Sequence, residues 1–161
     1  MVCSQPLVVK ALELVKVERP EDLSAIEAVL CRLMDSKLGR ELSSEWIADG
    51  STITVLYAAI ADTKIIKTKA GPRVWGTSGL SDIGKARITI NKLFLQAHHL
   101  DETIIFAHEV FGHMLAEKAA YRAGCGYMYA KHCVENETYA NLVGWIISFR
   151  PVRLKFRGNP S

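Results

Sequence analysis

The chain has 161 residues, of which 49% are hydrophobic, and it carries a formal net charge of +3. This length allows one domain with a hydrophobic core and is too short for two ordinary ones, so residues 1–161 are expected to form a single domain. No apolar run approaches the roughly 20 residues of a membrane-spanning helix, which excludes such a span. Part of the basic excess lies near the chain end, and no aromatic residues alternate with it, so we expect a solvated tail and no nucleic-acid partner.

Helical and strand patterns alternate in the first third of the sequence. Pro20 followed by two acidic residues is typical of a helix start, and apolar residues at helical spacing then predict a helix over about 20–35. A second helix is predicted over 38–48, because Asp49-Gly50 favours a C-terminal stop. Residues 51–57 are rich in β-branched and aromatic side chains and predict a strand.

The middle of the sequence is less regular and leads into two longer helices. Residues 61–84 contain several glycines and predict a loop-rich crossing with one short strand over about 64–69. Alternation of polar and apolar residues predicts a strand over 87–91. Asp101 is a typical N-cap for a strongly apolar helix, and a last helix is predicted over about 130–149. The fold class expected is α+β, with a short sheet and two central helices.

The sequence His108-Glu109-Val110-Phe111-Gly112-His113 brings two imidazoles and a carboxylate onto one predicted helix. Glu109 follows the first histidine directly, so it lies near a metal that the histidines hold without having to bind it. A general base for a metal-activated water occupies such a position. The motif predicts His108 and His113 as metal ligands and Glu109 as the catalytic residue.

The spacing of the two histidines is unusual. Residues at i and i+4 lie roughly 40° apart around a helix and can reach one ion, whereas the i and i+5 spacing found here is about 140° on an ideal helix. A single turn with i→i+5 hydrogen bonding would return His113 to the required place, and such bulges occur mostly at functional sites. Gly112 favours irregular backbone because it has no Cβ. We therefore predict a bulge in this helix.

A second motif supplies a third ligand. Glu137 lies 24 residues after His113, within Asn136-Glu137-Thr138-Tyr139-Ala140-Asn141. Glu135 competes for this role, but two residues are roughly 160° apart on a helix, so only one of the two carboxylates faces the histidines. Asn141, one turn after Glu137, could accept the outer N–H of a ligating histidine, or it could be an ordinary exposed asparagine.

These two motifs resemble those of known zinc peptidases. The segment Asn136 to Asn141 looks like the thermolysin-type pattern NExxxD, with Asn141 in place of the aspartate. His108-Glu109-x-x-Gly112-His113 is similar to the HExxGH motif of the dipeptidyl-peptidase III family, whose third ligand is also a glutamate on a later helix. About 40 residues carry this resemblance, which implies a gluzincin-like fold and Glu137 as the third ligand. The order of elements from Leu38 onwards also looks like the small metallopeptidase domains of bacterial effectors and toxins.

The function expected from sequence is that of a zinc metallopeptidase acting on a protein or peptide substrate. His108, His113 and Glu137 would hold Zn²⁺, with a fourth position for water, and Glu109 would move the proton. Nitrogen ligands favour zinc over magnesium. Burying two histidines and a glutamate on an apolar helix is costly without such a purpose, which weighs against a chance match. The sequence identifies no regulatory or inhibitory partner.

Two alternatives stay open at this stage. A metal or a histidine–carboxylate network could merely brace the two helices, with His132 as a closing fourth ligand. Alternatively, the substrate of a metal-dependent hydrolase could be something other than a peptide. Tyr127, Tyr129 and His132 are candidates for stabilising an oxyanion, although each is more simply structural.

The cysteines and the first ten residues indicate the cellular compartment in which we expect the protein. The four cysteines are scattered without a CxxC pair, so we expect reduced thiols and neither a thiolate zinc site nor a disulfide framework; Cys125 and Cys133 would pair only in an oxidising compartment. Met1 to Lys10 show no secretory signal. We expect the protein to stay in the cytoplasm where it is made unless a signal-peptide-independent secretion system exports it.

Overall fold

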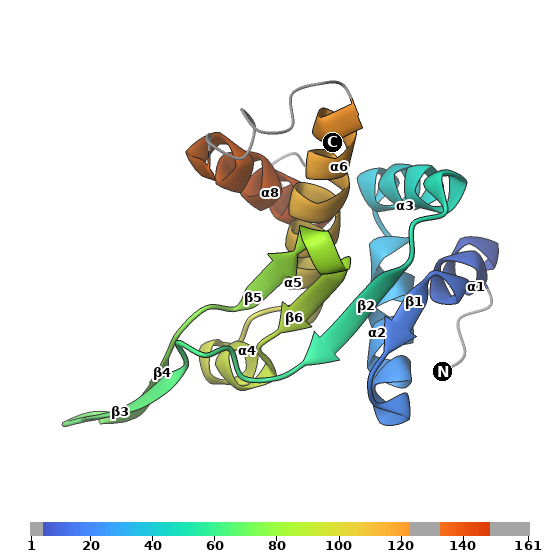
Figure 1. Ribbon diagram of the computed structural model, residues 1–161. Helices are drawn as coiled ribbons and strands as arrows, with labels where there is room; N and C mark the ends of the chain where they lie inside the picture. Colours follow the sequence, from blue (N-terminus) through green and yellow to red (C-terminus); the bar gives the residue numbers. More distant parts are fainter. Residues whose placement is uncertain (1–4, 123–132, 149–161) are drawn as a thin grey trace, which may run out of the picture.

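The computed structural model describes residues 5–122 and 133–148, without the side chains of residues 120–122, 133–136 and 148. The helices and strands follow in this order: α1 (Pro6–Glu13), β1 (Val15–Val17), η1 (Pro20–Asp22), α2 (Leu23–Leu33), α3 (Lys37–Asp49), β2 (Ile53–Tyr57), β3 (Lys64–Thr68), β4 (Gly71–Trp75), β5 (Gly79–Asp82), η2 (Ile83–Lys85), β6 (Arg87–Ile90), α4 (Lys92–His98), α5 (Glu102–Ala107), η3 (His108–Leu115), α6 (Ala116–Arg122) and α8 (Cys133–Ser148). Figure 1 shows their arrangement.

Four strands form the main sheet, in the order β1-β2-β6-β5. β2 is parallel to both β1 and β6, whereas β5 pairs antiparallel with β6 and forms one edge. Every second residue of β2 and β6 is buried and the residues between them are only half-buried. The sheet therefore has one face in the core, as alternating strands of a half-covered sheet require.

An aromatic cluster fixes the helix that continues from α5 into η3. The rings of Trp46 and Phe106 have centroids 6.4 Å apart, and Phe111 makes edge-on contacts to both at 6.2 and 6.4 Å. All three side chains are buried in the core. Aromatic pairs at these distances and tilts add to the energy of burial, so α3 holds α5 and η3 in place.

Strands β3 and β4 form a second, two-stranded sheet. This hairpin projects away from the main sheet, past α4, in Figure 1. Its base is attached by the buried side chain of Asn91, whose amide donates to the hydroxyl of Thr63 at 2.6 Å and to the carbonyl of Thr77 at 2.9 Å. At β4, the carbonyl of Val74 is 2.7 Å from Nε2 of His98. The hairpin is thus attached at its base and along β4.

The expected α+β class is confirmed: the described chain has helices and a small mixed sheet. The two early helices, the strands around 53–57, 64–68 and 87–90 and both long helices are present close to their expected bounds. The loop-rich crossing expected over 61–84 is wrong, because β4 and β5 lie within it. Both strands are short and begin with glycine, so they carry little alternation. Among the described helices, none has the length and apolar character needed to cross a membrane.

The expectation of reduced thiols is wrong for Cys31, which is disulfide-bonded. The side chains of the three other cysteines lie outside the described residues, as does the predicted turn at residues 124–126. Spacing along the chain predicted no bond, because a disulfide depends on the separation of two Cα atoms in space rather than in sequence.

Candidate metal centre

The bulge predicted in the helix that carries the two histidines is present. Residues His108–Leu115 form a π-helical segment of eight residues, continuous with α5 before it and α6 after it. Wide i→i+5 turns place residues five apart on the same side of the helix. The two imidazoles accordingly lie side by side, with ring centroids 4.8 Å apart. The irregular helix is thus what brings His108 and His113 to one point.

Glu137 of α8 reaches the same point. Its carboxylate oxygens lie 2.8 Å from Nε2 of His113 and 3.5 Å from Nε2 of His108, and the two histidine nitrogens are 3.1 Å apart. Among the described residues, His108, His113 and Glu137 form a group whose ligand atoms could hold one metal ion. Both histidines are largely buried, while the Glu137 side chain is 55% exposed.

These distances suit a small tetrahedral ion. Zinc binds nitrogen and oxygen at about 2.0–2.1 Å, so two ligand atoms of a tetrahedral site are about 3.4 Å apart. The histidine nitrogens are 3.1 Å apart, close to that value; of the two oxygens of Glu137, Oε1 lies 2.8 Å from His113 and Oε2 lies 3.5 Å from His108. Two imidazoles and one carboxylate also match the donor set of catalytic zinc sites, which keep a fourth position open. The three side chains could therefore hold a metal ion, and their donor atoms are of the kind that Zn²⁺ takes.

Glu109 lies beside the three ligands and outside their group. One of its oxygens is 3.9 Å from Nε2 of His108, and the residue is only 5% exposed. Burial raises the pKa of the Glu109 carboxyl to about 7; Glu137 adds to this rise, while His113 and a hydrogen bond from Ser81 oppose it. A carboxyl with a pKa near neutrality can both accept and release a proton at the pH of most cells.

Strand β5 forms the wall behind Glu109. A Cβ on Gly79 would lie 2.9 Å from Oε1 of Glu109 and 3.0 Å from its Cγ. Ser81, two residues along the strand and on the same side, supplies the hydrogen bond to the carboxyl. The absence of a side chain at residue 79 thus leaves the space that Glu109 occupies. Neither Gly79 nor Ser81 was expected at the site.

Asn141 contacts the first histidine. Burial, and then the neighbouring His113, lowers the pKa of His108, while Glu137 and a hydrogen bond to the Asn141 side chain raise it. Nε2 of His108 faces His113 and Glu137. Of the two interpretations of Asn141, partner of a histidine and plain surface residue, the structure supports the first. A lowered histidine pKa favours the neutral imidazole, which is the form that binds metals.

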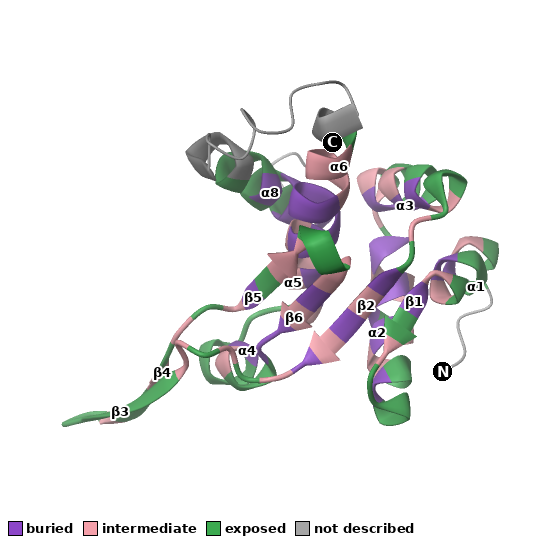
Figure 2. Cartoon of the chain, in the orientation of Figure 1, coloured by how far each residue is buried: buried purple, intermediate pink, exposed green. Residues whose placement is uncertain are grey.

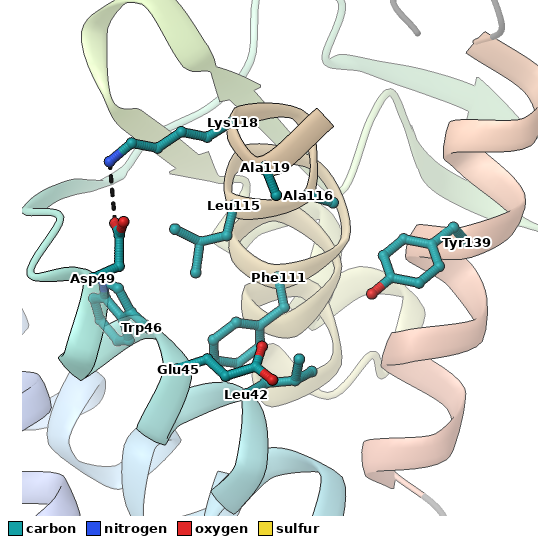
Figure 3. A pocket seen from close by; sticks show the side chains of 10 residues that line it. All are labelled: Leu42, Glu45, Trp46, Asp49, Phe111, Leu115, Ala116, Lys118, Ala119 and Tyr139. Atoms are coloured by element: carbon teal, nitrogen blue, oxygen red, sulfur yellow. Dashed lines mark hydrogen bonds and ion pairs between the residues drawn. The ribbon is translucent and has the colours of Figure 1, made fainter. Parts of the chain in front are cut away.

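A separate pocket lies on another side of the helix that carries His108 and His113. It has a volume of about 230 Å³ and its wall combines side chains of α3, η3, α6 and α8 (Figure 3). Phe111 and Tyr139 face it from the two helices that carry the ligands, and Lys118 pairs with Asp49 at its rim at 3.0 Å. The lining of this pocket includes none of the four residues of the candidate site, which are His108, Glu109, His113 and Glu137. The candidate metal centre is therefore separate from this pocket.

Several sequence candidates lie beyond the described part of the chain. Tyr127, Tyr129 and His132, considered for an oxyanion or a fourth ligand, fall in residues 123–132, and the side chain of Glu135 is likewise outside the description. Ser81 and Gly79 were missed because they precede the motif by more than 25 residues. The spacing of residues along the chain does not show which strand will contact a given helix in the folded protein.

Comparison of the chain with protein-family models, with curated proteins and with solved structures found no significant match.

Proposed function

We propose that this protein is a zinc-dependent metallopeptidase in which His108, His113 and Glu137 hold Zn²⁺. The observation that carries the proposal is the convergence of these three ligand atoms within 4.8 Å of one another. A buried glutamate lies beside them without joining the group. A histidine–histidine–carboxylate set with a separate carboxylate is the arrangement that metal-assisted hydrolysis needs.

In the proposed hydrolysis the metal ion and the side chains would have different roles. When bound, Zn²⁺ would acidify water and polarise the carbonyl of the scissile bond. Glu109 takes a proton from the attacking water and then passes it to the leaving amine, so that the nitrogen departs as a neutral group. This role requires a carboxyl that is ionised before the reaction and protonated during it. The raised pKa of Glu109 is compatible with both states.

The surrounding residues hold these groups in position. Asn141 orients His108, since a hydrogen bond to the outer ring nitrogen selects the tautomer that leaves Nε2 available as a ligand. Ser81 holds the carboxyl of Glu109 on the side of β5. Rigid placement of a base is worth a large factor in rate, because a displacement of about 1 Å can lower turnover roughly a hundredfold.

An extended peptide is the favoured substrate because of the position of β5. This strand is the edge of the main sheet and borders Glu109 through Gly79 and Ser81. The edge of a sheet presents backbone N–H and C=O groups that an extended chain can pair with. A peptide held along this edge would pass beside the general base. This relationship favours peptide over other hydrolysable substrates.

The experiment that tests the proposal combines metal analysis with peptide digestion. Purified protein should contain close to one zinc per chain, and His108→Ala and Glu137→Ala should lose most of it. Glu109→Gln should retain the zinc and lose cleavage of a mixed peptide library by a factor of at least about 10², as expected for loss of a general base. Glu41→Gln changes an exposed glutamate that pairs with Lys37 and should match the wild type in both assays.

The outcomes separate the proposal from its rivals. Absence of bound zinc under metal-replete conditions would reject the proposal and leave a histidine–glutamate hydrogen-bond network. Zinc that stabilises the fold would favour a structural brace if the wild type cleaves no peptide, or if cleavage is unchanged in Glu109→Gln. Hydrolysis of small esters or amides without any peptide cleavage would favour a non-peptide hydrolase.

A further inference from the structure

The β3–β4 hairpin is unusually exposed for a sheet of two strands. All five residues of β3 are exposed, and in β4 only Gly71 and Val74 are half-buried (Figure 2). An isolated two-stranded hairpin is only marginally stable in water. Within the described residues this hairpin has its contact to α4 through β4, while the backbone of β3 makes hydrogen bonds only to β4. The outer edge of β3 is therefore available for pairing.

Positive charge is concentrated on this hairpin. Lys64, Lys67, Lys69 and Arg73 are all exposed, and no acidic residue occurs between Asp62 and Asp82. These four cations exceed the formal net charge of +3 carried by the whole chain. A local positive field of this kind attracts an acidic partner and speeds its association.

Large apolar side chains share the same surface. Ile65, Ile66 and Trp75 are 65%, 46% and 55% exposed. Strand pairing places Ile66 opposite Arg73 and Trp75 opposite Lys64 on one face, with Ile65 opposite Val74 on the other. Apolar and cationic side chains thus occur together on both faces. Tryptophan and arginine are also the residues most enriched at the energetic centres of protein interfaces.

Protection of an exposed edge against aggregation explains only part of this composition. Lysines on an edge strand are a common device against unwanted pairing, and Lys64, Lys67 and Lys69 fit it. Such protective lysines are expected beside other polar residues. Here two isoleucines and a tryptophan on the same hairpin are exposed to solvent. Contiguous exposed apolar groups rimmed by charge are typical of an interaction surface.

We propose that the outer edge of β3 binds an acidic protein segment by strand addition, so that the partner forms a third strand of the hairpin sheet. A strand added at this edge projects alternate side chains onto both faces. Its acidic residues would meet the lysines and its apolar residues would meet Ile65 and Ile66. The proposal does not depend on the metal centre or on peptidase activity.

A protein strand accounts for the hairpin better than other anionic partners do. A membrane would contact one side of the hairpin or its tip, yet the tip residues Lys69 and Ala70 include no large apolar side chain and the isoleucines lie on opposite faces. Nucleic acid would use the cations and could stack a base on Trp75, but it leaves the exposed Ile65 and Ile66 unexplained, since bases stack on aromatic rings. Only a partner that pairs with the backbone uses both faces at once.

The test is selection of binders from a random peptide display library on the full-length protein. Enriched peptides should alternate acidic with apolar residues, and amide hydrogen exchange in residues 64–68 should slow when a selected peptide is added. Replacing Lys64, Lys67 and Lys69 together by glutamine should weaken binding roughly tenfold, an effect that shrinks at high salt. Ile65→Thr with Ile66→Thr, which keeps strand propensity, should weaken it by a similar factor.

A matched variant controls for net charge. Lys10, Lys16 and Lys37 are exposed and lie far along the chain from the hairpin, so replacing these three by glutamine should change affinity less than about twofold. Failure to enrich any peptide whose binding depends on the hairpin lysines would overturn the proposal. So would hairpin-dependent binding to phosphatidylserine vesicles or to a DNA duplex in the absence of peptide binding, because these would identify a lipid or nucleic-acid surface instead.

Discussion

Ala140 of α8 lies directly against the backbone of Gly112 in η3. A Cβ on Gly112 would be 2.5 Å from both the Cα and the Cβ of Ala140, a separation that real side chains do not adopt. The two helices therefore meet at backbone distance. This contact lies one residue before His113 and one turn after Glu137, so it determines how far the carboxylate stands from the imidazoles.

Replacing Gly112 by alanine should separate α8 from η3. Overpacking of this kind costs about 1–3 kcal/mol, against which alanine recovers up to about 1 kcal/mol of helix propensity. We expect a small loss of stability in urea and a much larger loss of zinc affinity, measured by competition with a chelator. Gly84→Ala is the control, because a Cβ there would meet nothing nearer than 3.7 Å. Wild-type zinc affinity in Gly112→Ala would contradict this account of the contact.

Replacing Gly79 by alanine should displace the general base and leave the ligands in place. The new Cβ would lie 2.8 Å from Cγ2 of Ile105 and 2.9 Å from Oε1 of Glu109. Under the proposed mechanism we expect turnover to fall roughly a hundredfold while the zinc content stays near one per chain. The measurement is kcat on a peptide identified by library digestion, beside metal analysis of the same sample. A parallel loss of zinc would mean that β5 supports the whole centre rather than Glu109 alone.

Replacing Asn141 by alanine should weaken zinc binding through His108. Loss of the partner of a ligating histidine typically lowers metal affinity by about 10- to 100-fold. Asn141→Asp keeps an acceptor for the ring N–H and should retain tight binding, which distinguishes the hydrogen bond from simple packing. Both affinities can be measured by chelator competition. Equal affinity in all three proteins would make Asn141 an ordinary surface residue.

Tyr57 should make the protein sensitive to alkali. Burial, with a further contribution from Glu102, raises the pKa of the Tyr57 phenol well above its ordinary value of 10.0. Above that pH the unfolded chain releases the proton and the folded chain keeps it, so stability falls as pH rises, by at most about 1.4 kcal/mol per pH unit. Tyr57→Phe should remove this part of the slope.

The measurement for Tyr57 is urea unfolding of both proteins between about pH 8 and pH 11. The difference in unfolding free energy should stay constant below about pH 10 and then shift in favour of the phenylalanine variant. Parallel curves across the whole range would mean that the phenol ionises as easily in the folded chain as in the unfolded one.

The sequence predicted the parts of the fold that have strong local signals. Pro20, Gly50 and Asp101 mark helix ends, and the helices between them run close to the expected bounds. The histidine spacing even predicted irregular backbone, since two imidazoles five residues apart can share an ion only if the helix widens. The structure brings His108, His113 and Glu137 together, as the two motifs require of one site.

What the sequence did not predict depends on contacts between distant segments. β5 is four residues long and was interpreted as loop, yet Gly79 and Ser81 are the residues that meet Glu109. The disulfide of Cys31 and the close approach of Gly112 to Ala140 are likewise properties of the folded chain. Spacing rules describe one helix or one strand at a time, so they contain no information on which strand will border which helix.

The wide turns of η3 also preserve the rotation of α6, because they absorb the extra residue between the histidines. Each residue of an α-helix turns it by about 100°, so tightening η3 to regular α-helical turns with all its residues kept would rotate every later side chain by roughly this angle. Lys118, whose ammonium lies 3.0 Å from Asp49, would then point away from α3, and the pocket in Figure 3 would lose that part of its wall. The histidine pair and the joint between α6 and α3 consequently depend on the same wide turns, whereas a deletion that shortened the motif to four-residue spacing would keep the joint.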